Sequence, residues 1–85
     1  IVPSNTYRCR DGKFIIIGGN GDSIFRRLMK VVGRDDLATD PDLEENIGRV
    51  KQEKVIDQAI ADWTARHEFS EVLAALESME SFQRY

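Results

Sequence analysis

The sequence lacks most of the residues that stapled, metal-bound or membrane-spanning proteins need. It has one cysteine, Cys9, and one histidine, His67. A single cysteine forms no disulfide within the chain, which favours a reducing, cytoplasmic setting. We expect no metal site, because the chain offers no second histidine and no cysteine at ligand spacing. The longest apolar runs, residues 14–17 and 72–76, are far shorter than the ~20 residues of a membrane-spanning helix, and we find no signal peptide, so we expect no membrane partner.

The composition is that of one small, well-solvated domain. The chain has 85 residues, of which 41% are hydrophobic and 32% are charged, so we expect a single domain over residues 1–85. Its net charge is -3, and its lysines and arginines are scattered among acidic residues. Nucleic-acid binding needs clustered cations, so we expect no nucleic-acid partner.

The first third of the chain predicts a β-hairpin. Asp11-Gly12 is a strong turn signal between two β-prone runs, so strands are expected at Tyr7–Arg10 and Lys13–Ile17. Residues 14–17 are all apolar, which predicts a strand covered on both faces. Residues 1–6 are expected to form an extended lead-in, since a proline biases the residue before it away from helix.

Apolar periodicity then predicts helices. Residues 24–32 repeat at helical spacing, with Asp22 or Ser23 as the N-cap and Gly33 as a left-handed C-cap. A short helical turn is expected at residues 34–38, followed by a loop at 39–42.

Two further helices are predicted in the second half of the chain. A turn at residues 46–50, broken at Gly48, precedes a long helix over 52–66, and Ser70 is the expected N-cap of a last helix. The long helix should bury five apolar residues: Val55, Ile56, Ala59, Ile60 and Trp63. We interpret Trp63 as a core anchor. The predicted fold class is α+β, a small antiparallel sheet with three to four packed helices.

The glycine-rich bend at residues 18–23 lies between a strand and a helix, where nucleotide-binding loops occur. A dinucleotide fingerprint starting at Gly19 would need glycine where Ile24 stands. A P-loop would need lysine where Asp22 stands. The bend is therefore interpreted as a turn.

Two other clusters have ordinary structural explanations. A Cys9–His67 nucleophile pair is a possible arrangement, but the sequence marks out no third residue to orient it, and Cys9 fits a small buried strand residue equally well. The acidic residues between 35 and 45 lack the ligand order and central glycine of an EF-hand, so we interpret them as a solvated loop.

One continuous stretch of sequence is more specific than any of these motifs. Residues 7–41, YRCRDGKFIIIGGNGDSIFRRLMKVVGRDDLATDP, are followed by Asn46-x-x-Arg49-Val50 and by IDQAIADWTARH. Together they resemble the small domain of the class III CoA-transferases (the formyl-CoA transferase-like, CaiB/BaiF family). The resemblance runs from Ile1 to about Met79. It departs at Gln52, often asparagine in the family, and at residues 80–85, a divergent tail where members have a Gly-Val-Pro-like return to the large domain.

The resemblance implies a role in moving CoA between carboxylic acids. Members use an aspartate of the large domain as the nucleophile, so the chain alone is expected to be inactive, with a CoA thioester as substrate and no tightly bound cofactor. The small domain would be a lid and scaffold, with the large domain and a second subunit as partners. Ser4, Asn5 and Thr6 would follow the glycine loop that closes the site and could bind acyl or CoA oxygens; no residue of the chain is expected to be catalytic.

A second function class stays open. The chain could be a free-standing remnant that acts as a non-catalytic protein-interaction module, using apolar surface meant for the large domain. Its start at Ile1 rather than methionine fits a segment of a longer polypeptide. A reading frame extending past both ends would favour the enzyme domain, and a start near Ile1 with a stop after Tyr85 would favour the module.

Overall fold

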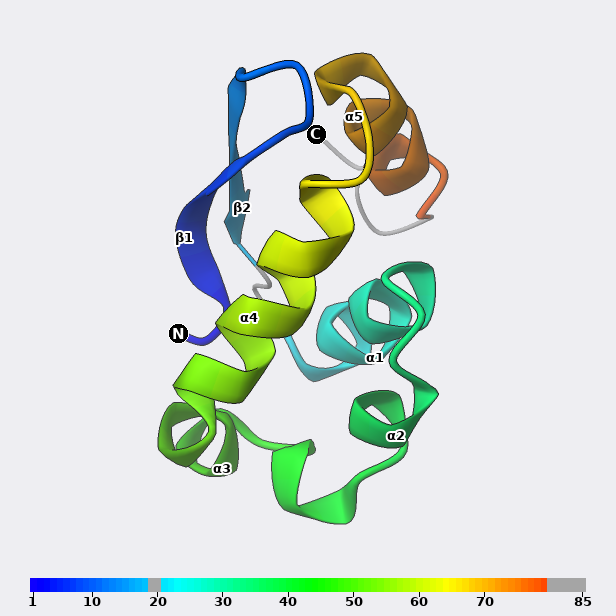
Figure 1. Ribbon diagram of the computed structural model, residues 1–85. Helices are drawn as coiled ribbons and strands as arrows, with labels where there is room; N and C mark the ends of the chain where they lie inside the picture. Colours follow the sequence, from blue (N-terminus) through cyan, green and yellow to red (C-terminus); the bar gives the residue numbers. More distant parts are fainter. Residues whose placement is uncertain (19–20, 80–85) are drawn as a thin grey trace.

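The computed structural model describes residues 1–18 and 21–79 (Figure 1). Its elements are β1 (Ser4–Arg8), β2 (Phe14–Gly18), α1 (Asp22–Val31), α2 (Asp35–Ala38), the 3-10 helix η1 (Pro41–Leu43), α3 (Asn46–Lys51), α4 (Glu53–Thr64) and α5 (Phe69–Glu77). The predicted α+β class is confirmed, with five α-helices in place of three to four. The divergent tail at residues 80–85 and part of the glycine bend lie outside the described residues.

The two strands form an antiparallel hairpin in which Tyr7 faces Ile15 and Arg8 faces Phe14. The predicted Asp-Gly turn is confirmed, with Gly12 at a φ of 83°, a value that favours glycine. The boundaries of β1 were predicted wrongly at both ends, and β2 begins and ends one residue later than predicted. β1 begins at Ser4, and Cys9 lies beyond its end, where its N–H donates to the Lys13 carbonyl across the turn (2.7 Å).

The prediction that β2 is covered on both faces is wrong. Ile15 and Ile17 are buried at 7% and 1% exposure, whereas Phe14 and Ile16 are 61% and 81% exposed. The helices pack on one side of the hairpin only: α4 contacts β1, while α1 packs against α2 and α5 (Figure 1). An apolar run predicts burial, but it does not predict where the covering layer comes from.

Helix α1 follows its predicted stripe, with Phe25, Leu28 and Met29 fully buried. Gly33 adopts a φ of 82° just after the helix, and the N–H of Arg34 donates to the Met29 carbonyl (2.8 Å), as in a Schellman C-cap. The predicted N-cap is wrong, because Gly21 occupies that position and no side chain caps the helix. Asp22 lies within the first turn, and its carboxylate accepts from Arg49 instead.

Helix α3 continues through Gly48, where a break was predicted. Gly48 is required here by close approach rather than by its φ, since a Cβ would lie 1.8 Å from the Asp42 carbonyl oxygen. In α4, Ile56 and Trp63 are buried as predicted, but Val55 is 43% exposed.

Helix α5 begins one residue before the predicted cap. Glu68 is its N-cap, and a capping box joins Glu68 to Glu71, each side chain bonding the other's backbone N–H. The prediction of Ser70 as N-cap is therefore wrong. A carboxylate can also cap a helix, because it accepts hydrogen bonds from the free N–H groups. Its negative charge is stabilised by the positive end of the helix dipole.

Candidate functional site

A shallow hollow of about 540 Å³ lies between β1 and α4. Asp57 is central to it: its Oδ1 accepts from the Tyr7 hydroxyl (2.6 Å), and its Oδ2 accepts from the Asn5 amide (3.4 Å). The residues that line the hollow are Asn5, Thr6, Tyr7, Arg8, Phe14, Lys54, Asp57, Gln58 and Ala61. Strand β1 and helix α4 are thus joined by polar groups that lie 50 residues apart in sequence.

Tyr7 is held in its neutral, donating form. Burial raises the pKa of its hydroxyl above the ordinary value, and the hydrogen bond to Asp57 and the charges of Asp57 and Glu53 raise it further. A phenol that stays protonated serves as a hydrogen-bond donor and not as a base. Tyr7 is therefore suited to binding and positioning rather than to proton abstraction.

The structure divides the three predicted binding residues between two faces. Side chains alternate along a strand, so Ser4 and Thr6 lie on the outer face and Asn5 on the face turned toward α4. All three are exposed, and Asn5 and Thr6 both line the hollow. Their role as substrate ligands stays a prediction.

A buried arginine organises the other end of the domain. Arg49 is 1% exposed, and its guanidinium lies over the Phe25 ring at 5.0 Å. Its Nε donates to the Val2 carbonyl (2.8 Å), and its Nη2 donates to Asp22 Oδ1 (2.9 Å). Its Nη1 donates to two further carbonyls, those of Leu43 and Glu44, both at 3.0 Å.

Asn46 completes this arrangement, because its Oδ1 accepts from the Val2 N–H (2.7 Å). Both backbone groups of Val2 are thereby held by the Asn46-x-x-Arg49 motif. The motif belongs to the resemblance, but its role was not predicted. The available signal was an arginine four positions before the long helix, at the end of an asparagine-led turn.

Helix α1 presents a basic face to a second hollow of about 310 Å³. Arg26, Arg27 and Lys30 line it together with Ser23, Thr39 and Glu44. Each of these three cations is exposed.

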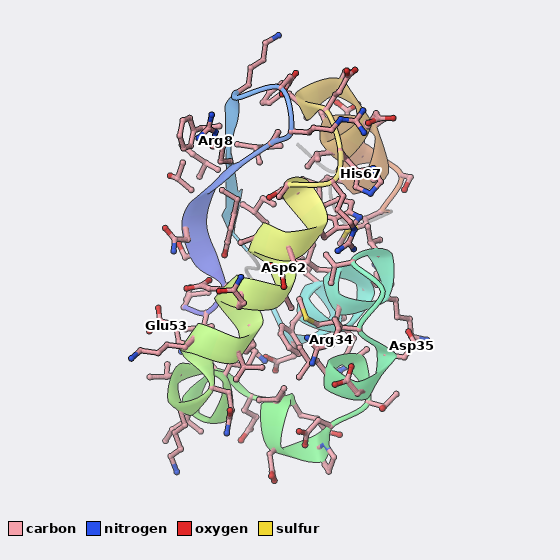
Figure 2. All side chains as sticks on the ribbon, in the orientation of Figure 1. Arg8, Arg34, Asp35, Glu53, Asp62 and His67 are labelled. Carbon is pink, nitrogen blue, oxygen red and sulfur yellow. The ribbon has the colours of Figure 1, made fainter. Side chains whose placement is uncertain are left out.

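Cys9 is a poor nucleophile. It is 2% exposed, and burial, aided by the charge of Asp11, raises the pKa of its thiol. His67 follows the carboxyl end of α4 (Figure 2). Its ring contacts that of Trp63, with the centroids 5.6 Å apart. The core role predicted for Trp63 is confirmed by its exposure of 6%.

The acidic stretch forms local structure rather than a cation site. The Asp40 carboxylate accepts from the Asp42 N–H (2.9 Å) and caps η1, so the predicted loop at 39–42 is partly helical. Arg34 donates two hydrogen bonds to Asp36, both at 2.9 Å, and lowers the pKa of that carboxyl. Within residues 1–18 and 21–79, no three His, Cys, Asp or Glu side chains are grouped closely enough to hold a metal ion.

None of the helices within the described residues has the length and apolar character needed to cross a bilayer.

Comparison with known proteins decides the family. The model of CoA-transferase family III matches residues 1–82. The chain belongs to CoA-transferase family III. Two curated relatives agree. The succinyl-CoA–D-citramalate CoA-transferase of Chloroflexus aurantiacus is 39% identical over 67 residues, covering 79% of this chain and 17% of that protein. The acetyl-CoA:oxalate CoA-transferase of Acetobacter aceti is 33% identical over 60 residues, covering 71% of this chain and 15% of that protein.

The chain thus spans only 17% and 15% of the lengths of these two family III relatives. No solved structure matches it.

Proposed function

We propose that this domain is the small domain of an enzyme that transfers CoA from an acyl-CoA to a carboxylic acid, and that it forms a wall and lid of the active-site cleft. The family match over residues 1–82 carries the proposal. Both relatives are named as CoA-transferases and are several times longer than this chain. In this assignment the large domain and a second subunit are its partners, the CoA thioester is a substrate rather than a resident cofactor, and the enzyme works in the cytoplasm.

The nucleophilic aspartate of the reaction lies in the large domain, so the 85-residue chain is inactive alone. The chemistry of its own residues supports this assignment. Cys9 is buried with a raised thiol pKa, and Tyr7 is held as a neutral donor. Neither side chain is an activated nucleophile or general base.

Within the cleft the hairpin supplies polar contacts to the substrate. Ser4, Asn5 and Thr6 bind acyl or CoA oxygens, and Asn5 is already oriented by its contact with Asp57. Orientation matters because a donor fixed before the substrate arrives loses less conformational freedom on binding.

A chimeric enzyme tests the proposal. The Chloroflexus aurantiacus relative, with its matching segment replaced by residues 1–82 of this chain, should convert the two substrates in its name. A matched chimera carrying Arg49→Met should lose most of that activity, because removing the buried guanidinium strongly destabilises the domain. An assembled chimera without turnover, or turnover by the pure 85-residue chain, would contradict the proposal.

A further inference from the structure

The outer face of the hairpin exposes large apolar side chains to water. It consists of Thr6, Arg8, Phe14 and Ile16, which the register sets in two facing pairs, Thr6 with Ile16 and Arg8 with Phe14. We call these four residues the outer hairpin face. Phe14 is 61% exposed and Ile16 is 81% exposed, side by side on one strand face. Figure 2 shows Arg8 on the side of the hairpin turned away from α4.

This exposure is not explained by the needs of the hairpin itself. A sheet with one solvated face normally alternates apolar and polar residues, and any polar β-former would satisfy positions 14 and 16. Residues 14–17 instead have the composition of a strand buried on both faces. The helices cover Ile15 and Ile17 only, so the second covering layer has to come from elsewhere.

The family relationship points to a covering partner within the same polypeptide. The matched relatives have more than four-fifths of their polypeptide outside the matching region, since the chain covers 17% and 15% of their lengths. A partner within the same polypeptide has an effective concentration in the millimolar range, which favours it over a second copy of this domain. Aromatic and arginine side chains such as Phe14 and Arg8 are also the types enriched where protein surfaces meet.

We propose that the outer hairpin face is the surface through which this domain docks onto the remaining part of its CoA-transferase. The inference rests on the proposed function and adds to it a specific surface. Thr6, Arg8 and Phe14 also line the hollow that contains Asp57. A partner seated on the outer hairpin face would therefore border that hollow.

The test uses the Chloroflexus aurantiacus chimera carrying residues 1–82 of this chain. Phe14→Glu and Ile16→Glu place a charge in the docking surface, and each should lower the yield of assembled enzyme, measured by sedimentation, about tenfold or more. The matched control is Ile47→Glu, since Ile47 is 72% exposed on α3, away from the hairpin. The control should assemble as the parent chimera does.

Thermal unfolding of the 85-residue chain separates docking from folding. Because Phe14 and Ile16 are exposed, both variants should melt within a few degrees of the parent chain. A chimera that assembles equally well with Ile16→Glu overturns the docking surface but leaves the proposed function standing. A parent chimera that never assembles contradicts the proposed function itself. If the 85-residue chain dimerises and Ile16→Glu abolishes only that dimer, the partner is a second copy and the proposal is wrong.

Discussion

Two regions of this small domain invert the usual rule that charges are exposed and apolar side chains are buried. Arg49 carries a charge and is 1% exposed, while Ile16 is apolar and 81% exposed. The first inversion is resolved within the chain, because every donor nitrogen of Arg49 bonds an oxygen of this domain. The second has no such resolution among residues 1–18 and 21–79. The buried charge stabilises the domain itself, whereas the exposed apolar surface is the basis for the proposed docking onto the rest of the enzyme.

Arg49→Met should have the largest effect on folding. It removes a buried guanidinium and leaves the carbonyls of Val2, Leu43 and Glu44 without that donor. We expect a loss of about 3–5 kcal/mol in the free energy of unfolding, a large part of the stability of a small domain. Urea titration of the 85-residue chain measures this loss.

The control for this variant is Arg26→Met, which removes an exposed arginine from α1. It should change stability by less than about 0.5 kcal/mol. Equal effects of the two variants would show that Arg49 acts as an ordinary surface charge. Arg49→Lys should destabilise the chain nearly as much as Arg49→Met does. A single ammonium group cannot reach all the acceptors that surround the planar guanidinium.

Gly48→Ala should have the next largest effect. It should destabilise the chain, although helix propensity alone would favour alanine. Replacing glycine by alanine inside an exposed helix normally stabilises it by up to about 1 kcal/mol. Here the new Cβ would lie 1.8 Å from the Asp42 carbonyl oxygen, so the backbone of η1 or α3 has to shift. We expect destabilisation of about 1–3 kcal/mol in the same urea titration.

Gly18→Ala is the matched control for the close approach. Gly18 has no heavy atom within 4 Å of its would-be Cβ, so its replacement should be nearly neutral. A stabilising Gly48→Ala would mean that η1 and α3 are not packed as described.

The sequence predicted features with local signals and missed contacts between residues far apart in the chain. The hairpin turn at Asp11-Gly12 and the stripe of α1 were predictable, because their signals are local. The role of Arg49 was not, since its partner Val2 lies 47 residues away. Strand β1 was predicted to begin too late, because Ser4–Thr6 is polar and gives no apolar alternation. The contact between Tyr7 and Asp57, 50 residues apart, left no local signal either.

Tyr7→Phe should have a smaller effect that depends on pH. It removes the 2.6 Å hydrogen bond to Asp57 and should lower stability by about 1 kcal/mol at neutral pH. The folded pKa of Tyr7 is raised above its unfolded value near 10, so the folded state holds this proton more tightly. Its contribution is complete below that pH and is lost as pH rises, by up to about 1.4 kcal/mol per unit.

Urea titrations of the parent chain and of Tyr7→Phe from pH 8 to 11 test this pH dependence of stability. The parent chain should lose stability relative to Tyr7→Phe above pH 10, and the two curves should converge. Parallel curves over the whole range would show that Tyr7 titrates alike in the folded and unfolded states.

The smallest expected effect compares two neighbours on β2 that differ only in which face they occupy. Ile17 is 1% exposed, so Ile17→Val should cost about 0.5–1.5 kcal/mol through the methylene lost from the core. Ile16 is 81% exposed, so Ile16→Val should leave the stability of the 85-residue chain unchanged within about 0.5 kcal/mol. In an assembled enzyme this asymmetry should shrink, because docking would bury Ile16 as well. Equal losses in the isolated chain would mean that the outer hairpin face is already covered there, and the contrast between the two regions would disappear.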